Sequence, residues 1–144
     1  MPKRIINTHH YYVGIDVGVH TGVALWNSPE RKFIEIKSMP IHKAMDYVRT
    51  LVARGYDIQV RFEDARKRQW FGTASVERLQ GAGSIKRDSQ IWEDFLSDEG
   101  ISYLPIPPKN NRTKLTRVAF DRLTGWNRAT NEHSRDAAML VFGI

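Results

Sequence analysis

Three carboxylates and one histidine have the types and spacing to do chemistry together. Asp16 interrupts residues 12–17, a run whose other side chains suit a buried strand. Glu63 ends a second strand-like run, and His133 and Asp136 lie three residues apart on one face of an expected helix. A lone carboxylate in a sheet costs several kcal/mol to desolvate unless it is paired or binds metal. We therefore expect these four side chains to converge.

The ligand chemistry of this set favours a hard divalent cation. Carboxylate oxygens suit Mg²⁺ or Mn²⁺, and an imidazole that titrates near neutrality can bind metal or transfer a proton. Taken singly, each residue also has an ordinary explanation. Asp16 suits a turn cap, Glu63 a strand-end ion pair with an arginine, Asp136 the dipole at a helix start, and His133 a simple helix-start position.

Two other acids compete for the same role. Asp64 directly follows Glu63, and Glu132 directly precedes the histidine of the set. Strand alternation places Asp64 on the opposite face from Glu63, so simple pleating allows only one of these two to be a ligand.

The elements that must position the set follow from periodicity and from glycine and proline positions. Residues 12–17 and 23–26 read as a hairpin, with Gly18 and Gly22 at a turn where φ is expected to be positive. A third strand, 32–39, alternates strictly, and strand 58–63 is expected to run parallel to the first. A fifth strand covers 101–104, followed by a proline-rich loop over 105–112. Helices are predicted over 41–54, 75–97, 115–123 and 134–142.

The inward face of each helix follows from helical spacing, and Gly55 and Gly125 are placed to end two of them. The residues expected to point inward are Ala44, Val48, Leu51 and Val52 in the first helix, Ile85, Ser89, Trp92 and Leu96 in the second, and Leu115, Val118, Ala119 and Leu123 in the third. Small residues around Gly81 and Gly83 indicate close approach by another element or a second subunit.

Composition predicts a single domain over residues 1–144, with residues 1–10 as a flexible lead-in. No apolar run approaches the ~20 residues of a membrane helix, and the basic start lacks the apolar core of a signal peptide. The chain has no cysteine, so it has no thiolate metal site. The net charge of +6 and the pI of about 9.8 favour a polyanionic partner such as nucleic acid.

Basic side chains gather in two segments that suit phosphate binding. The residues concerned are Arg66, Lys67 and Arg68, followed by the aromatic Trp70 and Phe71, and then Lys109, Arg112 and Lys114 in and beside the proline-rich loop. The alternatives are that the two aromatic rings fold onto the core and that the charges are simply solvated.

The ordered set of motifs resembles the RuvC-type Holliday-junction resolvases, a branch of the ribonuclease H-like nucleases. Residues 14–24 resemble the family's G-x-D-x-G-x-x-x-G-x-A hairpin, and Glu63 matches its second acid. The run from His133 to Ala138 resembles the final acid pair in the variant where histidine replaces the first aspartate. Residues 79–83 resemble the small-residue helix between them, and Lys109 and Lys114 are the nearest matches to the family's phosphate-contacting lysines. The resemblance covers about residues 12–142.

The resemblance implies an α/β, ribonuclease H-like fold with a five-stranded mixed sheet flanked by helices. It implies an endonuclease that resolves four-way or branched DNA by paired nicks, acting as a homodimer in the cytoplasm, or in the host cytoplasm for a virus-encoded member. Two Mg²⁺ or Mn²⁺ ions would be held by Asp16 as the bridging ligand, by Glu63, and by Asp136, with His133 as a ligand or proton-transfer group. No nucleotide cofactor and no membrane are expected.

Three other functions stay open on the sequence. A nuclease of the same fold acting on RNA, such as ribosomal-RNA processing proteins of the YqgF type, also opens with a G-x-D-x-G hairpin. A nucleic-acid-binding module without catalysis would share the charge. An actin-like ATPase shares a phosphate motif like residues 16–22, but it needs two domains and so more chain.

Overall fold

The structure, a computed structural model, describes residues 9–67, 76–108 and 114–144, apart from the side chains of residues 76–82. The strands are β1 (Tyr11–Asp16), β2 (His20–Asn27), β3 (Lys32–Pro40), β4 (Ile58–Glu63) and β5 (Tyr103–Ile106). The helices are α1 (Ile41–Ala53), α2 (Val76–Asp98), α3 (Arg117–Thr124) and α4 (Glu132–Met139), with a short 3-10 turn, η1, at Ala65–Lys67.

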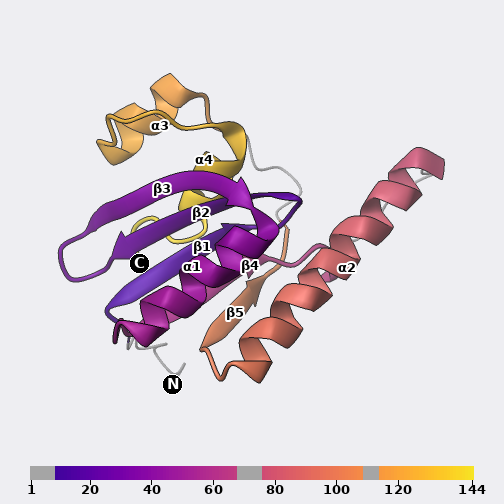
Figure 1. Cartoon of the computed structure of the whole chain (residues 1–144). Coiled ribbons are helices and arrows are strands. Elements are labelled where there is room, and N and C mark those ends of the chain that lie inside the picture. Colours follow the sequence, from indigo (N-terminus) through magenta and orange to yellow (C-terminus); the bar gives the residue numbers. More distant parts are fainter. Residues whose placement is uncertain (1–8, 68–75, 109–113) are drawn as a thin grey trace, which may run out of the picture.

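The strands form one mixed sheet in the order β3-β2-β1-β4-β5 (Figure 1). The strands β1, β2 and β3 follow one another antiparallel, while β4 runs parallel to β1 and β5 runs parallel to β4. The predicted α/β class and five-stranded mixed sheet are therefore confirmed, as is the parallel fourth strand. No helix within the described ranges combines the length and the apolar character needed to cross a membrane.

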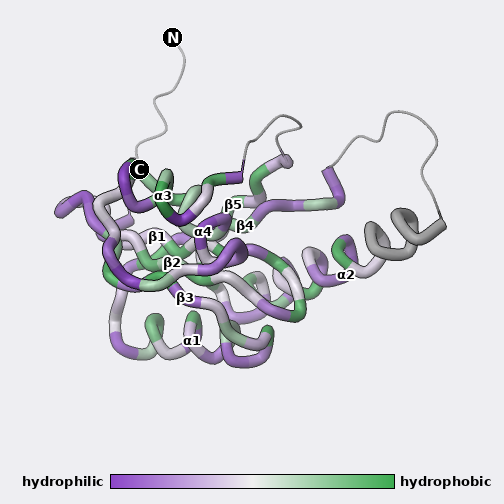
Figure 2. Tube along the Cα trace, turned by 90° about the horizontal axis from the view of Figure 1, so that it is seen from above, coloured by the Kyte–Doolittle hydropathy of each residue, from purple (hydrophilic) through white to green (hydrophobic). Residues whose placement is uncertain are grey.

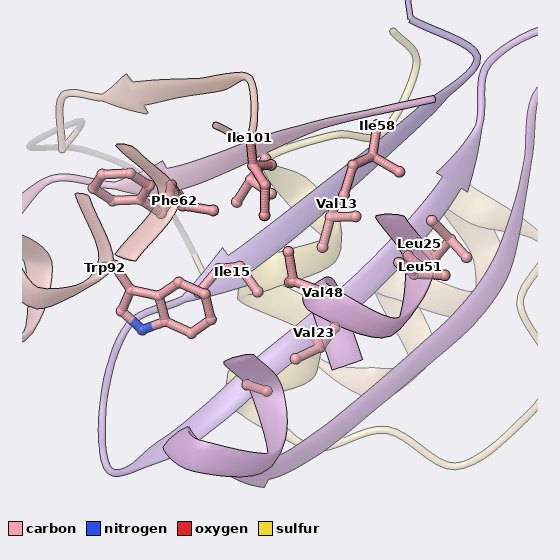
Figure 3. Close-up of a cluster of buried hydrophobic side chains, with 13 residues drawn as sticks. Val13, Ile15, Val23, Leu25, Val48, Leu51, Ile58, Phe62, Trp92 and Ile101 are labelled. Atoms are coloured by element: carbon pink, nitrogen blue, oxygen red, sulfur yellow. The ribbon is translucent and has the colours of Figure 1, made fainter. Parts of the chain in front are cut away.

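Helices cover both faces of the sheet. Helix α4 lies on β1, β2 and β3 with α3 beside it, and α1 lies on the opposite face (Figures 1 and 2). The core under α1 and α2 is shown in Figure 3 and is built from the buried residues Val13, Ile15, Val23, Leu25, Ala44, Val48, Leu51, Ile58, Val60, Phe62, Trp92, Leu96 and Ile101. The core under α4 is built from Tyr12, Ala24, Trp26, Phe33, Ile36, Phe120, Ala137, Ala138, Leu140 and Val141.

Alternation along β1 divides its side chains between these two cores. Val13 and Ile15 belong to the core under α1 and α2, whereas Tyr12 belongs to the core under α4. Gly14 and Asp16 share the parity of Tyr12, so the carboxylate faces the side of the sheet that α4 covers. Residues that contact the Asp16 carboxylate must therefore come from elements on this face of the sheet.

The strict alternation predicted for the third strand is wrong, because β3 contains an irregularity. The register shifts between Leu25 and Trp26, which pair with Glu35 and Phe33, so Ile34 has no partner of its own. A β-bulge of this kind rotates the following residues by one position. Phe33 and Ile36 are consequently buried in the same core, while Ile34 is 41% exposed.

The predicted inward faces hold for most of α1 and α2, and fail for α3. Val52 and Ile85 are exposed although helical spacing places them inward. Helix α3 buries Phe120, and Val118 and Leu123 are more than half exposed. The helix begins at Arg117, two residues later than predicted, and the Thr116 side chain caps it by accepting from the Ala119 N–H.

Two predictions about glycine and proline are corrected by the structure. Gly55 and Gly125 adopt left-handed φ as expected for helix ends, but the left-handed glycines of the described residues do not include Gly18 or Gly22. Residues 105 and 106 belong to β5 and not to the loop. Proline is tolerated there because β5 is an edge strand, where a missing N–H breaks no ladder.

The last two residues of the predicted lead-in make defined contacts with Asp57. His9 Nδ1 lies 2.8 Å from the Asp57 carboxylate, and the His10 N–H donates to the other oxygen of Asp57 at 3.2 Å. These contacts fasten residues 9 and 10 to the start of β4. Residues 1–8 lie outside the described part of the chain.

Candidate active site

Asp16 and His133 meet although 117 positions separate them in the sequence. Asp16 is the last residue of β1, and His133 lies in the first turn of α4. The His133 Nδ1 atom lies 2.9 Å from the Asp16 Oδ2 atom. The carboxylate is about one-quarter exposed and the imidazole about one-half, so the pair sits at the surface where a substrate is able to reach it.

Glycines in the hairpin bring α4 this close. Gly22 is the register partner of Asp16, and a Cβ atom added at Gly22 would lie 1.9 Å from the His133 carbonyl oxygen. A Cβ atom at Gly14 would lie 2.0 Å from the Ala137 carbonyl oxygen. The α4 backbone therefore rests directly on the hairpin backbone. Gly22 serves this close approach and not the positive φ that the sequence predicted for it.

A capping box decides where α4 begins. The Asn131 side chain accepts from the Ser134 N–H at 2.9 Å, and the Ser134 hydroxyl accepts from the Asn131 N–H at 3.0 Å. This reciprocal pair fixes the first helical turn. It places His133 over Gly22 and carries Asp136 along with it. The helix predicted over 134–142 therefore begins earlier, at Glu132. Sequence reasoning missed this cap, although an asparagine three residues before a serine is a recognisable signal.

Glu63 lies beside Asp16 because of the parallel pairing of β1 with β4. Ile15 pairs with Phe62, so the next residue of each strand is Asp16 and Glu63. Both share the strand parity that faces α4, since Phe62 is buried on the other side. Glu63 is partly exposed, and its carboxylate is one of the groups that act electrostatically on Asp16.

Negative charge accumulates at Asp16. Burial raises the pKa of Asp16, the hydrogen bond from His133 lowers it, and the nearby Asp136 and Glu63 carboxylates raise it again, leaving it at about 6. Burial is the largest cause of the raised pKa, and the negative charges of Asp136 and Glu63 add smaller contributions. The structure thus brings all four predicted residues to one region of the sheet.

Asp64, the rival acid, is occupied elsewhere. Its side chain is almost fully buried on the opposite face and accepts from Arg66 Nε at 2.8 Å and from a terminal Arg66 nitrogen at 2.8 Å. The bidentate guanidinium holds the pKa of Asp64 below its usual range. Arg66 also pairs with Glu93 of α2. These contacts anchor the segment after β4 to α2, so the guanidinium predicted to bind phosphate is already engaged within the chain.

Lys114, one of the predicted phosphate-binding residues, contacts two acids of α4. Its ammonium lies 2.6 Å from the Glu132 carboxylate and 3.5 Å from the Asp136 carboxylate. The hydrogen bond to Glu132 raises the pKa of Lys114. Glu132, the second rival acid, is therefore paired away from Asp16. Lys67 is exposed in η1. The remaining predicted nucleic-acid contacts lie outside the described residues, namely Arg68, Trp70, Phe71, Lys109 and Arg112.

The donor set fits a hard divalent cation in its chemistry. Three carboxylates and one imidazole gather where β1 and β4 end. A cation there would favour the charged form of Asp16, whose pKa is raised mainly by burial and in part by Asp136 and Glu63. Over residues 9–67, 76–108 and 114–144 no three such side chains stand close enough together to enclose an ion as they are placed. Binding would therefore draw Glu63 and Asp136 inward toward the Asp16–His133 pair.

Comparison with known proteins adds no relative to this picture. No protein-family model matches the chain, and no curated protein shows a significant match to its sequence. The assignment of the site rests on geometry and on ligand chemistry.

The pH dependence of stability follows from the raised pKa of Asp16. Its folded-state pKa of about 6 exceeds the ordinary value of 3.8, so its favourable contribution is full below pH ~4 and is lost as the pH rises through ~6. Asp16→Asn removes the buried charge. We expect the variant to be about 2 to 3 kcal/mol more stable than the wild type at pH 8 without metal, and equal to it near pH 4.

Urea unfolding in EDTA across this pH range measures the difference. Equal stability of the two proteins at pH 8 would show that Asp16 is as well solvated in the folded chain as in the unfolded one.

Proposed function

We propose that this protein is a metal-dependent, structure-selective endonuclease that resolves four-way DNA junctions by paired nicks. The observation that carries the proposal is the contact between Asp16 and His133, made beside Glu63 and Asp136. Hydrolysis of a phosphodiester by two cations needs such a set of oxygen ligands at one place. The predicted ribonuclease H-like relationship belongs to the same proposal.

The topology supports that relationship. The sequence predicts a hairpin and a third strand at the start, a fourth strand parallel to the first, and a final helix that carries the last acid. The sheet order β3-β2-β1-β4-β5 and the position of α4 over β1 and β2 have these features. The three acids come from β1, β4 and α4, in the order of the resolvase pattern.

In this proposal Asp16, Glu63 and Asp136 would together hold two Mg²⁺ or Mn²⁺ ions, with Asp16 as a ligand of both. The bound cations would activate water and stabilise the leaving 3′-oxygen. His133 is oriented by Asp16 through Nδ1, which leaves Nε2 directed away from that contact to bind metal or to hold a proton near the attacking water. Lys114 lies 3.5 Å from the Asp136 carboxylate, and in this proposal it would contact a phosphate of the substrate.

Charge and symmetry support the choice of substrate. The net charge of +6 suits a polyanion. Resolution of a four-way junction needs two nicks related by a two-fold axis, which two copies of the chain would supply as a homodimer.

The test is a panel of matched labelled substrates: a synthetic four-way junction, a linear DNA duplex of the same sequence, and an RNA version of each. With Mn²⁺ or Mg²⁺ we expect symmetric nicks in the DNA junction, slower cleavage of the duplex, and no cleavage in EDTA. Preferred cleavage of RNA would favour the RNA-processing alternative. Tight binding of all substrates without metal-dependent nicking would favour a binding module and contradict the proposal.

A further inference from the structure

A chain of hydrogen bonds along β4 ends at Arg61, two residues before Glu63. Asp57 contacts His9 Nδ1 at 2.8 Å, and the other ring nitrogen, Nε2, lies 3.3 Å from the Ser102 hydroxyl. The Gln59 amide donates to the same hydroxyl at 3.3 Å and accepts from Arg61 Nε at 3.1 Å. These contacts tie the N-terminal segment, β4 and the residue before β5 together, and they hold the Arg61 side chain in one orientation.

Arg61 lies on the same face of the sheet as the candidate site. Alternation along β4 puts Gln59, Arg61 and Glu63 together on the side away from buried Val60 and Phe62. The guanidinium lies over the ring of buried Tyr12, 5.1 Å from its centroid. The direction of the Arg61 side chain is thus set by the Tyr12 ring and by the hydrogen bond from Nε to Gln59.

Within residues 9–67, 76–108 and 114–144, the charge of Arg61 has no counterion. Among the residues that the structure describes, no carboxylate lies within ion-pair distance of it, and its two terminal nitrogens donate to none of them. Partial burial lowers the pKa of Arg61, because the cation is stripped of water without gaining an anion. Two other engaged guanidinium groups differ from it, since Arg49 pairs with Glu99 and Arg66 pairs with Asp64.

We propose that Arg61 binds a backbone phosphate of the nucleic acid that occupies the candidate site, with its two free terminal nitrogens. A rigid, partly desolvated fork is the arrangement that arginine uses for bidentate phosphate recognition. The phosphate would lie beside β4, two residues along the strand from Glu63. Leu104, the register partner of Arg61, is 39% exposed and would flank the phosphate with apolar surface. This inference rests on the proposed function, because it takes nucleic acid as the ligand.

A competing explanation is that Arg61 only covers the Tyr12 ring. Arg61→Met keeps an unbranched side chain over the ring and removes the charge and the donors, and Arg61→Lys keeps the charge without the fork. Arg49 provides a matched control, because its guanidinium also lies over an aromatic ring, 5.2 Å from the Phe95 centroid, but is paired with carboxylates. Thermal unfolding of every variant separates loss of folding from loss of binding.

The experiment measures binding of a labelled four-way junction by fluorescence anisotropy in EDTA, over about 50 to 200 mM salt. For Arg61→Met we expect an affinity about tenfold lower and a salt slope reduced by about one phosphate contact. Arg61→Lys should keep the slope, and Arg49→Met should bind as the wild type does.

Wild-type affinity and slope for Arg61→Met would overturn the inference and leave Arg61 as a cover for Tyr12. Absence of junction binding by the wild type would overturn it as well. Failure of this inference is distinguishable from failure of the nuclease proposal. Suppose that the wild type binds the junction but does not nick it with Mn²⁺, while Arg61→Met shows the reduced salt slope. The nuclease proposal then fails and the phosphate contact stands.

Discussion

Asp16→Asn is expected to reduce junction cleavage about a thousandfold or more while binding of the junction survives. The side chain joins His133 to the acid cluster and is the ligand proposed to bridge both cations. Charge stabilisation by a metal ion is worth several kcal/mol at the transition state, and each ~1.4 kcal/mol is a tenfold change in rate. The basic side chains proposed to bind phosphate are unchanged, so we expect affinity to be maintained. Single-turnover cleavage and anisotropy on the same substrate measure the two quantities.

Asp98→Asn is the control for this prediction. Asp98 is an exposed acid at the end of α2 and takes no part in the candidate site. The control variant should cleave at the wild-type rate. Wild-type cleavage by Asp16→Asn would remove the carboxylate from the chemistry and, with it, the metal assignment.

Gly22→Ala is expected to destabilise the protein by about 3 kcal/mol or more and to abolish cleavage. Overpacking usually costs about 1 to 3 kcal/mol when side chains are able to move. Here the new Cβ would lie 1.9 Å from the His133 carbonyl oxygen and 2.9 Å from the Ser134 nitrogen, which are backbone atoms of a capped helix. Relief requires α4 to move off the hairpin, and this movement separates His133 from Asp16.

Gly83→Ala in α2 is the matched control. A Cβ at Gly83 meets nothing within 4 Å, so the substitution should be neutral or stabilise by up to about 1 kcal/mol through helix propensity. Urea unfolding of the two variants and the wild type measures the difference. A Gly22→Ala protein as stable as the wild type would show that α4 does not depend on close backbone contact with the hairpin.

Much of the fold could be predicted from local pattern. The hairpin at residues 12–26, the parallel strand ending in Glu63 and the glycine-terminated helix before it follow from periodicity and turn chemistry. The strand parity that separates Glu63 from Asp64 also follows from alternation alone, and the burial of Asp64 against Arg66 agrees with it.

What failed depended on contacts between distant segments. The bulge at Ile34 depends on how β3 pairs with β2, and the exposure of Val118 depends on which face of α3 meets the rest of the molecule. Local spacing encodes neither. The role of Gly22 is visible only once α4 lies on it, because a glycine needed for close approach looks like a glycine needed for a turn. The Arg61 network links residues from 9 to 102 and has no signature in the sequence.

Direct binding of Mn²⁺ tests the central claim, that Asp16, Glu63, His133 and Asp136 form one metal site. The bound fraction is measured by electron paramagnetic resonance at pH 8, with wild type, Asp16→Asn and Asp98→Asn titrated in parallel and with thermal unfolding as a second readout. We predict saturable binding that stabilises the wild type and Asp98→Asn and is lost in Asp16→Asn. The titrations are repeated with the junction present. Equal Mn²⁺ binding by the wild type and Asp16→Asn, or no binding by the wild type in either titration, would contradict the account.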